Sequence, residues 1–183
     1  LLISSSCSQQ GSVIGSTAPE LPQAPQIEVL FNHSNNSRYR SPLTGRWRNG
    51  DDLEQFLIEA IEGAQREVLV AVQELTLPGI AMALIAARDR GLMVQVVLEN
   101  TYSTPWREQQ PTHLAKHQRQ RWDRLQQLAD LDGDGVTSDE EAADGDAIGL
   151  LREAGIPIVD DREDGSSGSG LMHHKFLVID GSS

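Results

Sequence analysis

An imidazole and an ammonium group lie near the end of the chain at a spacing that suits phosphate chemistry. The segment Met172–Gly181 contains the pattern H-x-K-x-x-x-x-D, made by His173, Lys175 and Asp180. Residues two apart on a strand point to the same face, so His173 and Lys175 can converge on one ligand, whereas His174 faces away and is expected to be structural. An imidazole can attack phosphorus, an ammonium can neutralise non-bridging oxygens, and a carboxylate can orient the imidazole. The pattern therefore indicates cleavage of a phosphodiester.

Together with the Gly-Ser pair that follows it, this motif resembles the hallmark of the phospholipase D superfamily. The resemblance covers residues 27–183 and implies an α/β fold, a layered sheet flanked by helices that forms one lobe of a normally two-lobed enzyme. It also implies a covalent phosphohistidine, protonation of the leaving group by a histidine from a second copy of the motif, and no catalytic metal. By position, His173 is the nucleophile or its acid/base counterpart, Lys175 is the phosphate clamp, and Asp180 supports the histidine network.

The sequence contains one copy of the motif, whereas the resemblance implies a site built from two. Two interpretations follow: a piece of a longer two-motif enzyme, or a single-motif protein that completes its site in a homodimer. The first residue is Leu1, and the sequence stops three residues after Asp180, so we favour the first interpretation. In either case the expected partner is a second lobe that carries the same motif.

The resemblance leaves the substrate open, because the same motif serves phospholipases, phospholipid synthases and nucleases. A net charge of -12 makes the chain a poor general binder of nucleic acid, which favours a phospholipid. A nuclease remains an alternative, because four arginines precede the first helix: Arg38, Arg40, Arg46 and Arg48. A third interpretation is a non-catalytic calcium-binding module of the cell envelope that keeps the motif as a relic.

The acidic run Asp130–Glu141 fits the twelve-residue calcium loop of an EF-hand, which needs oxygen ligands at positions 1, 3, 5, 7, 9 and 12. The expected ligands are Asp130, Asp132, Asp134, the carbonyl of Val136, Ser138 and Glu141. Gly135 occupies the sharp turn, although Thr137 stands where an aliphatic residue is usual. An acidic, solvated turn is the alternative. We expect Ca²⁺ here to be structural and to hold an insertion at about residues 118–154.

The helix that leads into this loop is basic, with Lys116, Arg119, Arg121 and Arg124. A solvated helix face is the default interpretation. The alternatives are a strip that meets anionic headgroups or a nucleic-acid backbone, and a metal held by His113 and His117 at a spacing of four. The glycines and serines of residues 165–170 are not a P-loop, since no G-K-[ST] follows.

The remaining elements must place the motif in a sheet. Apolar residues from Leu53 to Ala64 recur with the period of an amphipathic helix. The aliphatic run Val68–Val72 has no alternation, which predicts a strand buried on both faces. A β-prone run at Ile27–Phe31 precedes a long polar loop. We expect further helices from Pro78 to Gly91, at Gln118–Ala129 and at Asp139–Ala154, and further strands at Met93–Leu98, Ile156–Val159 and Phe176–Ile179.

The N-terminal residues suggest export. Leu1–Ile3, followed by serines and Cys7, is similar to the end of a lipoprotein signal, although Ser4 occupies a place that is usually aliphatic. We then expect residues 1–26 to be a signal remnant and a tether, with attachment to a membrane surface through Cys7 and a location outside the cell or in its envelope. The single cysteine excludes an internal disulfide. Residues 130–164 hold 13 acidic and two basic side chains, so the acidity belongs to one segment.

Overall fold

The computed structural model describes residues 26–41, 45–165 and 170–181. Cys7 and nearly all of the expected tether lie outside the described residues. The strands are β1 (Arg38–Arg40), β2 (Trp47–Asn49), β3 (Glu67–Val72), β4 (Met93–Leu98), β5 (Ile158–Asp160) and β6 (Lys175–Ile179). The α-helices are α1 (Leu53–Gly63), α2 (Pro78–Asp89), α3 (Lys116–Ala129), α4 (Asp139–Gly145) and α5 (Ala147–Glu153). Three short 3-10 helices join β4 to α3: η1 (Asn100–Tyr102), η2 (Trp106–Glu108) and η3 (Pro111–His113). None of the described helices is long and apolar enough to cross a membrane.

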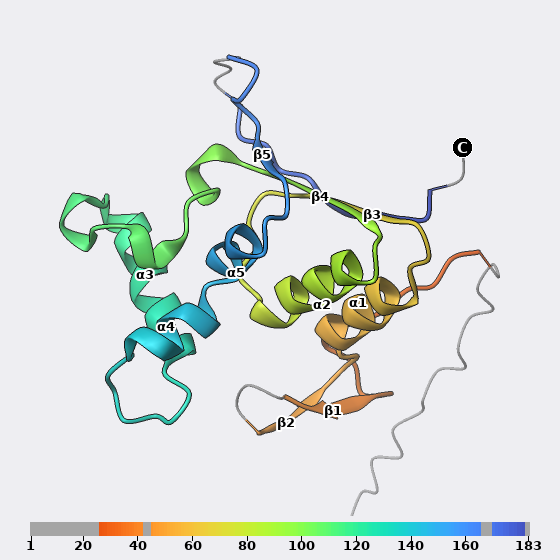
Figure 1. Cartoon of the computed structure of the whole chain (residues 1–183). Coiled ribbons are helices and arrows are strands. Elements are labelled where there is room, and N and C mark those ends of the chain that lie inside the picture. The colour runs from red at the N-terminus through yellow and green to blue at the C-terminus, as the bar shows by residue number, and fades with distance from the viewer. Residues whose placement is uncertain (1–25, 42–44, 166–169, 182–183) are drawn as a thin grey trace, which may run out of the picture.

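A four-stranded mixed sheet forms the centre of the lobe, in the order β5-β4-β3-β6 (Figure 1). β3 pairs in parallel with β4 and β4 with β5, whereas β6 runs antiparallel to β3. This confirms the α/β fold expected from alternating helices and aliphatic runs. Because β6 is antiparallel, its first residue, Lys175, lies opposite Val72 at the carboxyl end of β3.

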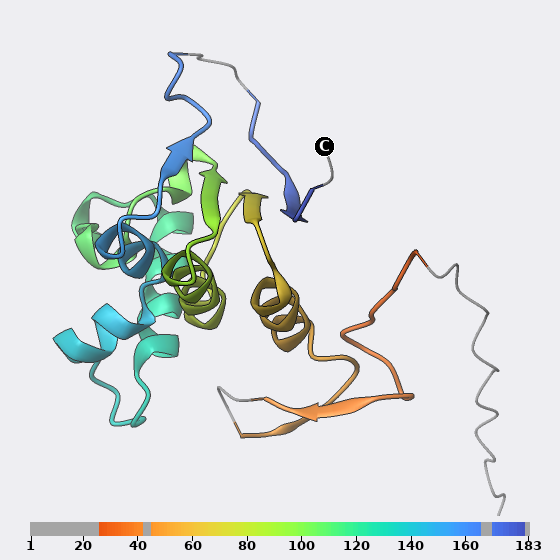
Figure 2. The same cartoon turned by 45° about the vertical axis from the view of Figure 1, so that its right-hand side comes forward.

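In the part of the chain that the structure describes, helices cover one face of this sheet. In Figure 2 the helices α1, α2 and α5 all lie on the same side of the four strands. Val68 and Val70 face these helices and are buried, whereas Leu69 and Ala71 between them are only partly buried. The expectation that Val68–Val72 is buried on both faces was therefore wrong. The open face of the sheet presents apolar side chains, including Phe176 at 49% exposure.

The covered face holds the main core. Ile61 of α1, Leu84 of α2, Leu98 of β4 and Leu151 of α5 have no exposed surface. Burial of each such side chain stabilises the fold by roughly 1.5–3 kcal/mol. Helix α1 begins where Asp52 accepts a hydrogen bond from the backbone N–H of Gln55. Together these contacts fix α1 and α2 beneath the strand that pairs with the motif.

The polar segment before α1 differs from the expectation. Ile27–Phe31 is not a strand in the structure, and the expected loop contains the β1–β2 hairpin instead. The Arg38 guanidinium lies 4.6 Å from the ring centroid of Trp47 across this hairpin. The carboxylate of Asp51, which follows the hairpin, accepts a hydrogen bond of 2.8 Å from the Phe31 N–H. Local polar contacts of this kind have no apolar periodicity, so the sequence pattern gave no signal for them.

A second, smaller core joins η2, α3 and α4. Trp106, Leu125 and Ala129 are its buried members, and the rings of Trp106 and Trp122 meet edge to face at 6.1 Å. Gly145 permits the close crossing of α4 on α3, because a Cβ atom there would lie 2.5 Å from Ala129 Cβ. The expected single helix Asp139–Ala154 is broken at Asp146, between α4 and α5.

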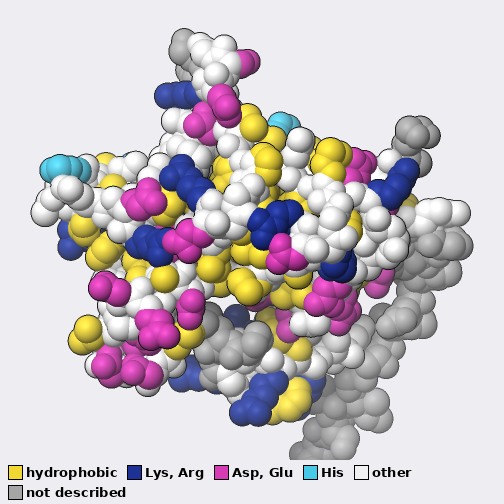
Figure 3. All heavy atoms as spheres, in the orientation of Figure 1, with side chains coloured by type: hydrophobic (Ala, Val, Ile, Leu, Met, Phe, Trp, Pro, Cys, Tyr) yellow, Lys and Arg dark blue, Asp and Glu magenta, His cyan; other side chains and the backbone are white. Residues whose placement is uncertain are grey.

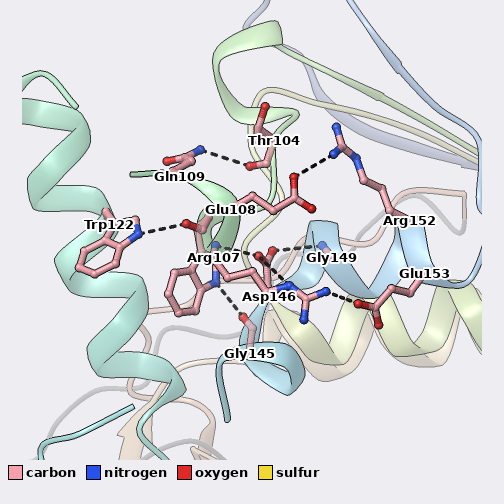
Figure 4. A network of polar contacts seen from close by, with 11 residues as sticks. Thr104, Arg107, Glu108, Gln109, Trp122, Gly145, Asp146, Gly149, Arg152 and Glu153 are labelled. Atoms are coloured by element: carbon pink, nitrogen blue, oxygen red, sulfur yellow. Dashed lines mark hydrogen bonds and ion pairs between the residues drawn. The ribbon is translucent and has the colours of Figure 1, made fainter. Parts of the chain in front are cut away.

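Asp146 fixes the segment around α3 and α4 to the main lobe (Figure 4). Its carboxylate caps α5 by accepting from the Gly149 N–H at 3.1 Å, and it also accepts from the Arg107 N–H at 3.1 Å. Burial raises the pKa of the Asp146 carboxyl, and these hydrogen bonds partly offset that effect. Arg107 in turn pairs with Glu153 of α5. α5, which we had expected to belong to the insertion, packs in the main core.

Candidate functional site

The motif begins at the edge of the sheet where β3, β4 and β5 all end. Lys175 is exposed there, and its Nζ donates a hydrogen bond of 3.2 Å to Oε1 of Gln73, the residue that follows β3. The Gln73 N–H donates to the His174 carbonyl at 2.9 Å, which extends the β3–β6 pairing past its last strand residue. Ligands of sheets with parallel strands bind outside the carboxyl ends of those strands, and the motif occupies this position.

Lys175 lies at this edge as the first residue of β6, and His173, exposed to solvent, lies two positions upstream in the segment that leads into the strand. Among the described residues, no side chain forms a hydrogen bond or an ion pair with the His173 imidazole. His174 packs its ring edge to face on Phe176, at 5.7 Å between centroids. Phe176 belongs to the open face of the sheet, so His174 points away from Lys175, which agrees with its expected structural role.

Asp180 lies at the other end of β6, and its expected contact with the histidine network is not formed. It lies five positions after Lys175, which is roughly 16 Å along a strand at about 3.3 Å per residue. Its carboxylate accepts three backbone N–H bonds from the α1–β3 connection: Gln65 at 2.8 Å, Arg66 at 2.6 Å and Glu67 at 3.1 Å. These bonds hold the pKa of Asp180 below its usual value, with the Gln65 bond as the largest cause. The expected role of Asp180 was therefore wrong: it anchors the strand.

We call the sheet edge at the carboxyl ends of β3, β4 and β5, where Lys175 lies, the motif edge. The sequence did not identify several polar residues there as members of the site. Glu74 follows β3 and pairs with Arg121 of α3, whereas Glu99 follows β4, is 4% exposed and accepts from the Thr101 N–H at 2.8 Å. The Oδ1 atom of Asn100 is buried and has no hydrogen-bond partner among the described residues. Each of these residues lies within two positions of the carboxyl end of β3 or β4, and this position was the signal that could have found them.

The basic helix α3 is not a uniformly solvated face. The side chain of Arg121 is only 12% exposed, pairs with Glu74 and stacks on Tyr102 at 5.0 Å. Arg119 pairs with Asp123 at 3.1 Å on the helix surface. Because the Glu74 pair joins α3 to the end of β3, Arg121 lies beside the motif edge. His113 and His117 stand in different helices, η3 and α3, so they do not share one helical turn.

The acidic loop joins α3 to α4, as in a helix-loop-helix unit. One carboxylate oxygen from each of Asp130, Asp132 and Asp134 lies within 4.8 Å of the others. A hollow beside them is lined by five of the six expected ligand residues, since Val136, Ser138 and Glu141 also border it with Asp132 and Asp134. Figure 3 shows Asp and Glu side chains gathered on this side of the molecule.

Backbone contacts preorganise the loop. Asp130 accepts hydrogen bonds from the N–H groups of Gly133 at 2.8 Å and Gly135 at 2.9 Å, and Gly135 has a φ of 85°. Glu141 accepts from the Ser138 and Leu131 N–H groups at 2.9 and 2.8 Å. Hydrogen bonds, led by the Ser138 N–H, lower the pKa of Glu141 to about 2. The carboxylate is therefore ionised at neutral pH, as a calcium ligand must be.

Residues 57–183 match the family model described as "Cardiolipin synthase, PLD-like domain". The chain is 28% identical over 125 residues to a mitochondrial cardiolipin hydrolase of Xenopus laevis, and 28% identical over 118 residues to that of Xenopus tropicalis. These alignments cover 68% and 64% of this chain, but only 39% and 36% of the two relatives.

Among solved structures, the chain is similar to a phospholipase D family member, Nuc from Salmonella typhimurium. The identity is 20% and the TM-score 0.38, with 69% of this chain and 56% of that chain covered. The family assignment rests instead on the sequence model, which spans more than half of the chain and includes α2, the sheet and the motif strand. The chain therefore belongs to the phospholipase D-like superfamily of phosphodiesterases.

Proposed function

We propose that this chain contributes His173 and Lys175 to a site that hydrolyses the phosphodiester bond of a phospholipid through a phosphohistidine. The observation that carries the proposal is that His173 and Lys175, two positions apart in the sequence, are both exposed at the carboxyl edge of the sheet. Two relatives are named cardiolipin hydrolases, which supports a phospholipid as the substrate. The matched region spans about two fifths of those relatives, so the activity of a complete enzyme is part of the proposal.

In this reaction an imidazole nitrogen of His173 forms a bond to phosphorus as the bond from phosphorus to the alcohol oxygen breaks. The departing oxygen takes a proton from an acid, and water then attacks the phosphohistidine to release the phosphate monoester and restore the imidazole. The Lys175 ammonium lies against the non-bridging oxygens and offsets their charge in the transition state. Its hydrogen bond to Gln73 holds the ammonium at the edge before substrate arrives.

The acid that protonates the leaving group must come from outside the motif. His174 faces the open side of the sheet, and Asp180 lies at the far end of β6. We propose that a second copy of the motif supplies it, either from a further part of a longer chain or from a second molecule. Because the geometry at the edge leaves His173 accessible, a second lobe can approach it without displacing a described contact.

Hydrolysis of bis-p-nitrophenyl phosphate, followed as nitrophenol release with mass spectrometry for a phosphoryl adduct, tests the proposal. We expect turnover and an adduct on His173, and loss of both in His173→Asn, by at least about 10³-fold. Mixtures of wild type and His173→Asn distinguish a site shared between two molecules from a site completed within one longer chain. If two molecules form one site, activity falls with the square of the wild-type fraction, whereas independent chains give a linear fall. A turnover unchanged in His173→Asn would overturn the proposal.

Cleavage of nucleic acid is the second candidate, favoured by the arginines of the first hairpin. Arg38, Arg40 and Arg48 lie on β1 and β2, and Arg40 Nε donates to the Gly45 carbonyl at 2.9 Å. In Figures 1 and 2 this hairpin lies on the helix side of the lobe, with α1 between it and the sheet. A backbone groove would have to pass around α1 to reach Lys175, so we favour a lipid. Competition between an oligonucleotide and phospholipid vesicles for turnover discriminates the two.

We also propose that the Asp130–Glu141 loop binds Ca²⁺ in a structural role. The converging carboxylates of Asp130, Asp132 and Asp134 and the hollow lined by the other ligand residues support this. Ca²⁺ would offset the repulsion within a segment of net charge -11, made by 13 acidic and two basic residues. We expect Ca²⁺ to raise the Tm of wild type but not of Glu141→Gln, with Asp139→Asn as a matched control. No shift in wild type would contradict the site.

The third possibility, a calcium-binding envelope module without turnover, is tested by the same assays. It predicts a calcium-dependent Tm together with no nitrophenol release by any assembly of the chain. Export and attachment through Cys7 stay predictions, since Cys7 lies outside the described residues. Labelling of the mature protein with a fatty-acid analogue, compared with Cys7→Ser, would test them.

A further inference from the structure

An apolar cleft separates the main lobe from the α3–α4 segment. Its volume is about 430 Å³, within the range of roughly 300–1,000 Å³ that is usual for small-molecule sites. Ile58 of α1 and Leu77 before α2 form one wall, and Leu125 and Leu128 of α3 form the other. Leu131 of the acidic loop also lines the cleft. This cleft is separate from the motif edge, since neither His173 nor Lys175 lines it.

All of the charged side chains that line the cleft are acidic. Asp52 and Glu54 belong to the start of α1, and Asp144 belongs to α4. No lysine, arginine or histidine among the described residues lines it. Since Leu77 and Leu128 are also 40% and 43% exposed, the walls are open to a ligand. The charges thus favour a ligand that is positive where it meets the cleft.

Glu54 differs from Asp52, its neighbour in the cleft, whose carboxylate accepts a hydrogen bond from the Gln55 N–H. The half-buried Glu54 carboxylate makes no hydrogen bond or ion pair with any described residue. Burial raises the pKa of this carboxyl, and the charge of Asp52 adds to the effect. Gly79 makes room for it, because a Cβ atom at Gly79 would lie 2.7 Å from Glu54 Oε1. A partly desolvated carboxylate without a partner is costly, and a cationic ligand would offset that cost.

From the cleft and its charges we infer a binding site for a cationic amphiphile, a ligand with one alkyl chain and a terminal ammonium group. The alkyl chain lies between Ile58 and Leu77 on one side and Leu125 and Leu128 on the other. The ammonium pairs with Glu54, and Asp52 and Asp144 add to the attraction. This site stands independently of the proposed phosphodiesterase activity, because it shares no residue with the motif edge.

Calorimetric titration of the protein with dodecylammonium below its micelle concentration tests the inference. Dodecanol and dodecyl sulfate serve as probes with the same chain and a neutral or negative head. We expect dodecylammonium to bind at least about 10-fold more tightly than dodecanol, and dodecyl sulfate more weakly than either. Equal affinities for the three heads, or no binding to a protein of unchanged Tm, would overturn the site.

Two variants locate the site. Glu54→Gln should lower the affinity for dodecylammonium at least about 10-fold and leave that for dodecanol unchanged. Glu62→Gln, the same change on an exposed residue of α1 outside the cleft, should alter neither. Leu128→Trp should weaken both probes by filling the cleft. If Glu54→Gln has no effect, or if a lysine-flanked apolar peptide binds where dodecylammonium does not, the assignment of a small amphiphile is wrong.

Discussion

The two ends of β6 are built in opposite ways. At the upstream end, Lys175 makes one side-chain hydrogen bond, to Gln73, and the His173 imidazole makes none with the described residues. At the downstream end, the Asp180 carboxylate accepts three backbone hydrogen bonds, and Arg66 donates to the Asp180 carbonyl at 2.8 Å. We call the upstream end the reactive end, because it carries the proposed catalytic side chains, and the downstream end the anchoring end, because its polar groups are hydrogen-bonded to the backbone and side chain of residues 65–67.

The spacing of the motif therefore matters for the register of β6 as well as for the chemistry at its upstream end. A slip of one residue along β3 would turn His173 and Lys175 to the other face of the sheet. The Asp180 bonds prevent this slip, because they tie the end of β6 to the backbone of residues 65–67. The anchoring end thus sets the register that places Lys175 opposite Val72. The following predictions test this division of roles.

The largest effect is expected at the reactive end. Lys175→Met should lower kcat for bis-p-nitrophenyl phosphate by about 10²- to 10³-fold, because the transition state loses a cation beside its non-bridging oxygens. The Tm should stay unchanged, since Lys175 is exposed. Gln73→Ala, which removes only the partner of the ammonium, should lower kcat less than about 10-fold. A Lys175→Met variant with full kcat would show that the reactive end does not act on phosphate.

A smaller effect, on stability, is expected at the anchoring end. Asp180→Ala should lower the Tm by about 5 °C or more, because three N–H groups lose their acceptor and the φ of 50° disfavours alanine. Asp180→Asn, which keeps one carbonyl acceptor and tolerates this backbone conformation, should lose less. Calorimetry gives Tm, and kcat per folded molecule should stay near that of wild type. A large loss of kcat at unchanged Tm would instead place Asp180 in the chemistry.

The smallest effect is expected in acid. The pKa of Asp180 is lowered in the folded state, so its contribution to stability is complete above its unfolded pKa of about 3.9. It is lost as the pH falls through the lower folded value. Glu141 behaves likewise, losing its contribution as the pH approaches about 2. Urea midpoints measured against pH should fall less steeply in Asp180→Asn, and Gln73→Ala should keep the wild-type slope. Parallel slopes in both variants would contradict the anchor.

Sequence patterns predicted the elements whose side chains repeat with a fixed period. The strand Met93–Leu98 was predicted with its observed bounds, and α2 was expected from Pro78, where it begins. The aliphatic run Val68–Val72 does not reveal whether helices cover one face of the strand or both. A strand covered on both faces would have the same apolar residues. The hairpin β1–β2 was missed since cation–π and backbone contacts hold it, and these leave no periodicity.

The sequence predicted the parts of the candidate site that depend on local spacing, and missed those that depend on distant segments. The spacing of His173 and Lys175 predicts that they share one face; the structure places Lys175 at the sheet edge beside Gln73 and His173 two residues upstream, and their shared face stays a prediction. The partners of Asp180 could not be predicted, because they are backbone groups more than 100 positions away. The sequence of α3 predicts Arg121 on a solvated face. Its partner Glu74 follows β3, so their ion pair could not be predicted from the helix alone. Contacts between distant segments require the assembled fold.

The pairing of β6 with β3 also determines when the site can form. It joins residues as far apart in the sequence as Val68 and Ile179, across the whole acidic segment, whereas β3, α2 and β4 follow one another directly. Closing a long loop costs entropy before its contacts are made, so non-local pairings tend to form late in folding. During synthesis β3, α2 and β4 emerge from the ribosome before β6. We therefore expect the edge proposed to bind phosphate to be assembled last, so that an unfinished chain would lack the proposed site.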